Sequence, residues 1–413
     1  MKQGLKTAVL ALCLGLGIAA HAVGQVSAAD YIKSGKAREG NGDPDGAITD
    51  YNRAIALDPK NAKAYNSRGV AEYDKQDLDS AIADYNRAIE LDPKYTAPFI
   101  NRGNARGVRG DIKGAMADYS SAIEIDPKND DALYSRGTAR ADQGDLDGAI
   151  ADLTRAVEAD PTDNYAFNDR GEIKAHKGDL DGAIADFNRS LELNPKYVRS
   201  LNGRGLARKD KGDLDGALAD FNRAITLDPK NAASYTDRGG IEHARGSLDE
   251  AIADFNRALE LNPKDINALN NRGNTKADKG DPDGAITDYN RAIEIEPKSA
   301  GAFYNRGNVK LGKSDFEGAI ADYNRVLEIN PKHAMACNNR GYAKAAKGDQ
   351  EGAMADYDHA LSLDPKLATA YYNRSKIEKA KGDSDGAAVD MIQAILYDPK
   401  LAEPSPPATT PKR

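Results

Sequence analysis

Cysteine is nearly absent from this chain of 413 residues, which contains only Cys13 and Cys337. Cys13 lies in an apolar N-terminal run that we expect to be removed, so one thiol would remain and no internal disulfide could form. The fold must then be held by packing. Histidine is also scarce. His176 and His243 have no cysteine or histidine near them in the sequence, which predicts no metal site and no cofactor.

The chain also lacks an excess of positive charge. Lysine and arginine number 57 against 65 aspartates and glutamates, and the net charge is -8. Such a surface has no global attraction for nucleic acid or anionic lipid, so we expect neither as a partner. The sequence shows no nucleophile–base constellation and no phosphate-cradling glycine loop. We therefore expect that the protein is not an enzyme.

Long apolar runs are missing except at the N-terminus. Lys2 and Lys6 precede an apolar run over 8–20, and a small-x-small site ends at Ala22. This pattern predicts a signal peptide over 1–22, a short lead-in over 23–27, and a periplasmic or secreted protein. An uncleaved membrane anchor is the alternative, but the run is shorter than the roughly 20 residues that a spanning helix needs.

What the sequence does contain is a strict period. From Pro59 to Pro399, eleven prolines follow one another at intervals of 34 residues without insertion or deletion. A fixed period of this size indicates a solenoid, in which each unit buries its apolar face against its neighbours. We number the positions of a repeat as slots 1 to 34. The eleven repeats then end at Leu401 and begin at Ala28, Ala62, Thr96, Asp130, Asn164, Val198, Ala232, Ile266, Ala300, Ala334 and Ala368.

Each repeat encodes two antiparallel helices. In the second repeat, apolar and small residues mark one face of a helix that runs to about Lys75, and an i, i+3, i+4, i+7 pattern from Leu78 to Ile89 marks another. Asp77 is placed to cap the second helix, and Asp92 before Pro93 ends it. Beyond the array, residues 402–413 are proline-rich and are expected to be a disordered tail.

Small residues recur where the two helices must approach each other. Slot 8 is glycine in ten repeats and slot 20 is alanine in all eleven, while slots 4 and 24 are mainly aromatic or leucine. In these features the chain resembles the tetratricopeptide repeat (TPR) family over residues 28–401. The resemblance implies a right-handed superhelical α-solenoid whose concave surface is lined mainly by the first helix of each pair. It also implies a scaffold that binds peptides or proteins, and together with the N-terminal signal we expect a bacterial, exported member of the family.

The chain departs from that family at slot 7, where ten repeats carry arginine, and at slot 11, which is always charged. A charge on an inward face needs a partner, and slot 23 is aspartate in every repeat. We predict that each arginine pairs with an aspartate of its own or an adjacent repeat. The candidate structural ion pairs comprise Arg68, Asp84, Arg102, Asp118, Arg204, Asp220, Arg272 and Asp288. A phosphate- or acidic-peptide-binding arginine row is the alternative, which the matching aspartates disfavour.

Slots 2, 5, 9, 12 and 13 of the first helix vary from repeat to repeat, as a recognition surface requires. Asparagine can hydrogen-bond a peptide backbone, and tyrosine adds rigid apolar area. The candidate peptide groove comprises Asn66, Tyr134, Asn168, Asn202, Asn270, Asn274, Tyr304, Asn308, Asn338, Tyr342 and Tyr372. No repeat has the slot-5 lysine on which the carboxylate clamp of chaperone-binding family members depends. Solvated helix surface without a ligand is the alternative.

The last repeat is unusually apolar at its end. Ile392 and Leu396 occupy slots that are mainly polar or charged elsewhere, and Tyr397 follows them. Solenoid ends are normally polar, so these three residues form a candidate docking site. The leading hypothesis is a non-catalytic scaffold of the cell envelope that binds a polypeptide in its groove. Membrane contact would then come only through a partner or an uncleaved signal. The alternative is a self-assembling envelope component, a homo-oligomer joined through its repeat ends.

Overall fold

The computed structural model describes residues 26–402. The secondary structure of these residues is entirely helical and consists of the α-helices labelled α2 to α23 and one short 3₁₀ helix. The predicted signal peptide and all of the predicted tail except Ala402 lie outside the described residues. Ala402 ends a short 3₁₀ helix, η1, over Pro399–Ala402. No helix within 26–402 is long and apolar enough to cross a membrane.

The helices alternate between first and second members of a hairpin. The first helices are α2 (Ala28–Gly40), α4 (Ala62–Asp74), α6 (Thr96–Val108), α8 (Asp130–Asp142), α10 (Asn164–His176), α12 (Val198–Asp210), α14 (Ala232–Ala244), α16 (Ile266–Asp278), α18 (Ala300–Gly312), α20 (Ala334–Ala346) and α22 (Ala368–Lys381). The second helices are α3 (Pro44–Leu57), α5 (Leu78–Leu91), α7 (Ile112–Ile125), α9 (Leu146–Ala159), α11 (Leu180–Leu193), α13 (Leu214–Leu227), α15 (Leu248–Leu261), α17 (Pro282–Ile295), α19 (Phe316–Ile329), α21 (Gln350–Leu363) and α23 (Ser384–Tyr397).

Local signals explain where the helices begin and end. Asp77 accepts a hydrogen bond from the backbone N–H of Ser80 and so caps α5, as the sequence predicted. Most first helices are followed by a glycine with positive φ, for example Gly144 at 81°, a conformation that costs glycine little. Gln76 and Ser314 occupy the same slot with φ of 64° and 61°, and are the non-glycine residues with positive φ in the described chain.

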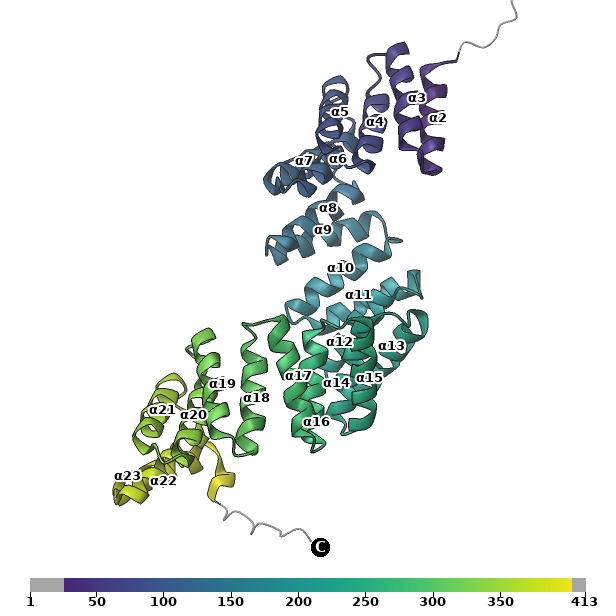
Figure 1. The fold of residues 1–413 in the computed structure, drawn as a ribbon. Coiled ribbons are helices and arrows are strands. Elements are labelled where there is room, and N and C mark those ends of the chain that lie inside the picture. The colour runs from purple at the N-terminus through teal and green to yellow at the C-terminus, as the bar shows by residue number, and fades with distance from the viewer. Residues whose placement is uncertain (1–25, 403–413) are drawn as a thin grey trace, which may run out of the picture. The chain divides into compact units, whose positions relative to one another are not determined.

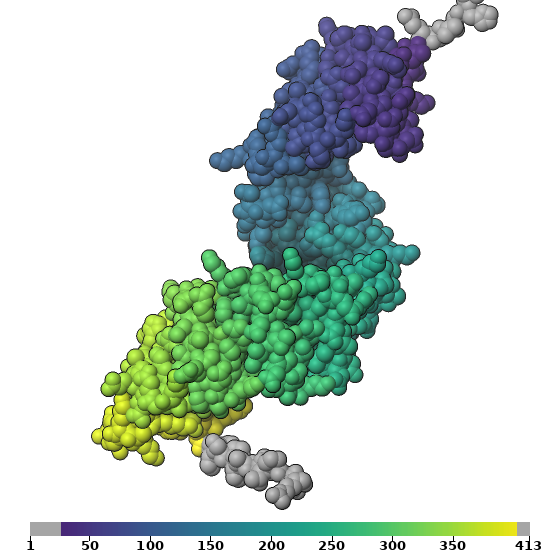
Figure 2. Space-filling view, in the orientation of Figure 1, coloured from purple at the N-terminus to yellow at the C-terminus, as the bar shows by residue number. Residues whose placement is uncertain are grey.

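Two units, Met1–Ser200 and Leu201–Arg413, divide the chain within α12. Within each unit a hairpin packs against the hairpins before and after it in sequence (Figure 1). Figure 2 shows this order on the surface of the second unit, where the colour passes steadily from teal through green to yellow. The all-α architecture of stacked helix pairs that the sequence predicted is confirmed.

Slot 8 sets the distance between the two helices of a hairpin. A Cβ added to Gly69 would lie 2.7 Å from the Tyr85 ring, and one added to Gly273 would lie 2.6 Å from the Tyr289 ring. The aromatic side chain at slot 24 therefore packs directly on the glycine backbone. This confirms the prediction that a larger residue at slot 8 would force the helices apart. Cys337, at slot 4, is a buried free thiol within the same kind of core.

The first helices lie on the inner side of each unit. Consecutive first helices, such as α4 and α6 or α16 and α18, contact each other directly, whereas consecutive second helices do so weakly at most. A stack curves toward the elements that are closer together. The inner face of each unit is therefore lined by first helices, which places the variable slots of that unit on one face.

Candidate functional site: the face of the first helices

Each arginine at slot 7 forms a two-pronged ion pair with the slot-23 aspartate of its own repeat. In repeat eight, Arg272 Nε and Nη2 donate to the two carboxylate oxygens of Asp288 at 2.9 and 2.5 Å. The other predicted pairs have the same geometry: Arg68 with Asp84 (2.6 and 2.6 Å), Arg102 with Asp118 (3.0 and 2.6 Å), and Arg204 with Asp220 (2.9 and 2.5 Å). The aspartates are buried, so these charges serve the interior of the stack.

The remaining nitrogen of the fork reaches back to the preceding repeat. Arg272 Nη1 donates to Asn256 Oδ1 at 2.7 Å, and Arg306 Nη1 donates to Asn290 Oδ1 at 2.6 Å. The acceptor always stands at slot 25, which is asparagine, serine, threonine or aspartate in the repeats concerned. One arginine therefore links the two helices of its own repeat to the repeat before it.

The residue at slot 11 determines whether each buried aspartate has a second positively charged partner. In most repeats slot 11 is a lysine or arginine that adds a third contact, as Lys276 Nζ does to Asp288 at 2.8 Å. In repeat two, slot 11 is Glu72, which lies beside Arg68 and Asp84. Burial, followed by the negative charge of Asp84, raises the pKa of Glu72 to about 7, and its Oε2 is buried without a hydrogen-bond partner.

The predicted groove residues at slot 5 do not all reach the inner surface. Asn66, Asn168 and Asn338 are buried, in contrast to the expectation that they contact a peptide. Slot 5 lies at the junction of successive first helices, where these side chains bond along the stack. Asn168 Oδ1, for example, accepts from Ser200 Oγ at 2.7 Å. They join repeats rather than face a ligand.

The other predicted groove residues at slot 5 are half-buried, and most of them contact neighbouring side chains. Asn202 accepts from Ser234, Tyr134 donates to Asp169, and Tyr304 accepts from Asn339. Tyr372 lies under Lys376, whose Nζ is 4.0 Å from the ring centroid. The Oδ1 of Asn270 is buried without a partner. The slot-5 side chains are therefore only partly accessible on the inner face.

Asparagines at slot 9 are held in one orientation. Tyr289 Oη donates to Asn274 Oδ1 at 2.7 Å, and Tyr323 Oη donates to Asn308 Oδ1 at 2.8 Å. Asn308 Oδ1 also accepts from Asn339 at 3.0 Å. Because the amide oxygens are engaged by buried tyrosines, the Nδ2 groups are the hydrogen-bond donors left to face outward. The same arrangement occurs in repeat three, where Asn104 at slot 9 accepts from Tyr119 Oη at 2.8 Å.

Two hollows lie beside these amides. In the first unit, a cavity of about 400 Å³ is lined by Asn104, Tyr134, Thr138 and neighbouring residues. In the second unit, a cavity of about 370 Å³ is lined by His243, Asn274, Asn305 and Asn308 among others. The first has one amide side chain and the second has three, and each has an aromatic ring from slot 24, so both offer hydrogen bonds beside apolar area.

Sequence reasoning missed part of this surface. Asn104 was not among the candidates, nor was slot 6, although Asn305 lines the cavity of the second unit. A signal was present, because slot 6 is asparagine in five repeats, at Asn101, Asn271, Asn305, Asn339 and Asn373. Of the predicted residues, Asn274 and Asn308 lie in the cavity, and Tyr342 is exposed on the same helical face.

Ionisable side chains on this face do not assemble into a metal centre. Within 26–402, no group of three or more histidine, cysteine, aspartate or glutamate residues could hold a metal ion. His243 Nε2 lies 2.7 Å from Asp278 Oδ2 in the next repeat, which is an exposed pair at the rim of the cavity. The chemistry of the face is that of hydrogen-bonding amides.

Family models of tetratricopeptide repeats match most of the chain. One tetratricopeptide repeat model matches residues 32–96, 134–198 and 202–266, and another TPR repeat model matches 109–144, 273–314 and 341–382. Further tetratricopeptide repeat models match 300–333 and 255–287. The chain belongs to the tetratricopeptide repeat family. Among curated proteins, none matches this TPR chain.

Solved structures with similarity to this TPR chain include MamA, at 25% identity over 40% of this chain and 96% of that one, with a TM-score of 0.37. YrrB, described as a TPR protein with an unusual peptide-binding site, is 23% identical over 46% of this chain and 97% of its own, with a TM-score of 0.40. A TPR protein from Parabacteroides merdae is 22% identical over 60% of this chain and 98% of its own, with a TM-score of 0.48.

The last TPR repeat presents apolar side chains to solvent. Ile392 and Leu396 are 64% and 65% exposed, and Val389, one helical turn before Ile392, is 58% exposed. Tyr397 is 39% exposed and also packs on Tyr371, with ring centroids 6.1 Å apart. The most exposed apolar residues are therefore Val389, Ile392 and Leu396, and Val389 was not among the predicted residues.

Proposed function

We propose that this TPR protein is a non-catalytic scaffold that binds an extended segment of a protein partner along the inner face of its first helices. The observation that carries the proposal is the set of slot-9 amides whose oxygens are engaged by tyrosine hydroxyls. Their Nδ2 groups point donors at a hollow face, and backbone carbonyl oxygens are the acceptors that an extended polypeptide offers in regular order. TPR proteins generally bind peptides and proteins, which supports this reading.

We further propose that the scaffold acts in the bacterial cell envelope, as a periplasmic or secreted protein. The support is the signal-like sequence over 1–22, with its basic start, apolar run and small-x-small site. Fractionation of cells that produce the full chain, with N-terminal sequencing of the product, tests this. A product that begins at Met1 and remains in the cytoplasm would contradict it.

Selection of random 12-residue peptides displayed on phage, with the full chain as the target, tests the groove. The affinity of a selected peptide is then measured for Asn274→Asp and for Asn290→Asp. Both changes add one negative charge to repeat eight. In Asn274→Asp the side chain loses its outward donor but keeps an oxygen for Tyr289. Asn290→Asp is the control, because Asn290 is at slot 25, where repeat ten already carries an aspartate, Asp358, that accepts from Arg374.

We expect Asn274→Asp to weaken the selected peptide about tenfold, because a donor is replaced by a charged acceptor. Asn290→Asp should leave its affinity within about twofold, because slot 25 serves the stack rather than the ligand. Equal effects of the two variants, or failure to select any peptide, would contradict binding on the inner face.

A further inference from the structure

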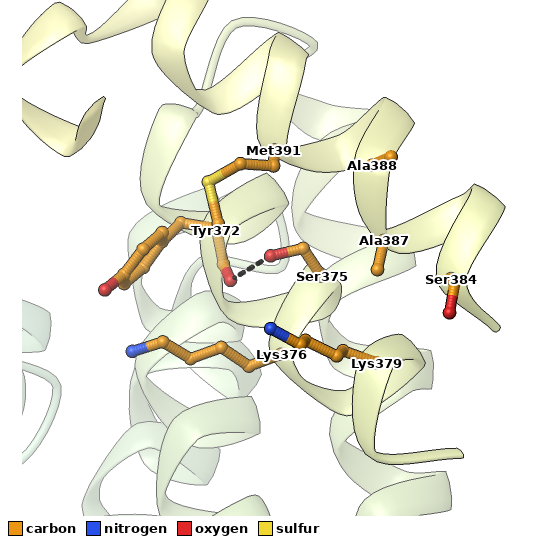
Figure 3. Close-up of a pocket in the computed structure, with 8 residues that line it drawn as sticks. All are labelled: Tyr372, Ser375, Lys376, Lys379, Ser384, Ala387, Ala388 and Met391. Atoms are coloured by element: carbon orange, nitrogen blue, oxygen red, sulfur yellow. Dashed lines mark hydrogen bonds between the residues drawn. The ribbon is translucent and has the colours of Figure 1, made fainter. Parts of the chain in front are cut away.

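The outer end of the last repeat forms a hollow between α22 and α23. Its volume is about 430 Å³, and Figure 3 shows the residues that line it. Met391 extends from α23 toward Tyr372, while Lys376 and Lys379 extend from α22 on the same side (Figure 3). The hollow thus has an apolar wall and a basic edge.

The same slots form a seat for a helix in an interior repeat. In repeat three, slots 9, 12, 17, 20 and 24 are Asn104, Gly107, Ile112, Ala115 and Tyr119. The opposite wall of that cavity comes from α8, the first helix of the next repeat, through residues such as Tyr134 and Thr138. In the last repeat the five slots are Lys376, Lys379, Ser384, Ala387 and Met391. The end hollow is therefore lined by the slots that, in repeat three, face the first helix of the next repeat.

The side chains of this seat carry two positive charges, which no interior seat does. Slots 9 and 12 are both lysine in the last repeat and in no other. Within the described residues, Lys376 and Lys379 have no carboxylate within ion-pair distance, and both are exposed. The Nζ of Lys376 lies over the face of the Tyr372 ring. Two neighbouring cations beside an apolar wall fit an acidic counterpart.

The residue at slot 25 indicates that the helix bound at this seat is not a further repeat of the same kind. Interior repeats place a polar acceptor there, which receives Nη1 of the next arginine, as Asn290 does from Arg306. In the last repeat this slot is Ile392, which cannot accept a hydrogen bond. A first helix with arginine at slot 7 would bury that nitrogen without a partner.

The first helix of repeat one, α2, is the exception that carries serine at slot 7. It does not fit the seat either, because its slot 3 is Asp30, whereas the other repeats have alanine, serine or proline there. Asp30 is exposed and accepts from the Ser27 backbone at the start of α2. Docking α2 on a second copy would bury that carboxylate. Head-to-tail association of this chain is therefore disfavoured.

We propose that the end face of α22 and α23 binds an amphipathic helix of a partner protein, with its apolar side on Met391 and Ile392 and its acidic side chains on Lys376 and Lys379. This is recognition of a helix by a groove at the last repeat, where slots 9 and 12 carry Lys376 and Lys379 in place of the slot-9 amides of the proposed peptide groove. The exposed Val389 and Leu396 extend the apolar area beyond the seat.

A peptide probe follows from α8, which covers the equivalent seat of repeat three. The acidic probe has the sequence of α8 (Asp130–Asp142) with Ser135→Glu, Arg136→Leu and Thr138→Glu, and the basic probe has Ser135→Lys, Arg136→Leu and Thr138→Lys. Each is held helical by a covalent staple, because an isolated helix of this length is unstable. Fluorescence anisotropy measures binding of both probes to the full chain and to the double variant Lys376→Glu with Lys379→Glu.

We expect the full chain to bind the acidic probe about tenfold more tightly than the basic one, from two exposed charge pairs. The double variant should reverse this order, and Ile392→Asp should weaken the acidic probe. Asn274→Asp should leave the acidic probe unaffected, which separates this site from the groove. The helical content and melting temperature of each variant show that it folds.

Three results would overturn the proposal. The first is that neither probe binds. The second is that the full chain and the double variant prefer the same probe. The third is that sedimentation shows a concentration-dependent dimer that Ile392→Asp abolishes. The last result would assign the end face to a second copy of the chain.

Discussion

Asp288→Asn removes one negative charge from the interior of repeat eight and leaves the shape of the side chain unchanged. The side chain of Asp288 is 3% exposed and holds Arg272 by two hydrogen bonds and Lys276 by one ion pair. Without the carboxylate, two cations face each other across a buried site. We therefore expect this repeat to lose stability through an uncompensated charge rather than through a cavity.

The size of the effect follows from the burial of the cations. Removing one partner of a buried pair typically costs about 3 to 5 kcal/mol. The Arg272 side chain is 19% exposed and keeps its bond to Asn256, so the lower end of that range, about 3 kcal/mol, applies to Asp288→Asn. Arg272→Met should cost less, about 1 to 2 kcal/mol, because Lys276 still neutralises Asp288.

Urea unfolding followed by circular dichroism measures the loss of stability, and hydrogen exchange locates it. In a stack of repeats the defect should be greatest in α16 and α17 and decrease in repeats farther away. The matched control is Asp283→Asn in the same repeat, whose side chain is 80% exposed and pairs with Lys313, and it should cost about 0.5 kcal/mol or less. If the two aspartate variants lost equal stability, the reasoning about buried charge would be refuted.

Two further predictions concern positions where the chain departs from its own pattern. The pKa of Glu72 is about 7 in the folded chain, against its usual value of 4.5, which we take for the unfolded chain. Its contribution to the free energy of unfolding therefore falls as the pH rises from 4.5 to 7 and is constant above pH 7. Glu72→Gln should therefore stabilise the chain at pH 8 by about 1 to 2 kcal/mol and reduce the pH dependence of urea unfolding, whereas exposed Glu90→Gln should change neither. Gln76→Gly and Ser314→Gly should each raise stability by about 1 kcal/mol, because these residues have positive φ. Gln143→Gly, at a φ of -87°, should lower the melting temperature or leave it unchanged, and an increase equal to that of the other two would contradict the argument from φ.

The sequence was sufficient for everything that repeats within one hairpin. Its period predicted the paired helices, and the glycine at slot 8 predicted their close packing on an aromatic ring. The residues at slots 7 and 23 could be recognised as partners because their charges balance. These inferences depend on contacts between two helices joined by a short turn, where helix geometry and turn length determine which side chains meet.

Contacts between successive hairpins were decided only by the tertiary structure. That the third nitrogen of Arg272 reaches Asn256 depends on how one hairpin sits on the next. The same stacking buries Asn168 while leaving the Nδ2 of Asn274 as the outward donor, although both are asparagines on a first helix. A sequence period places side chains on a helix, but the packing of the next hairpin determines which of them remain exposed.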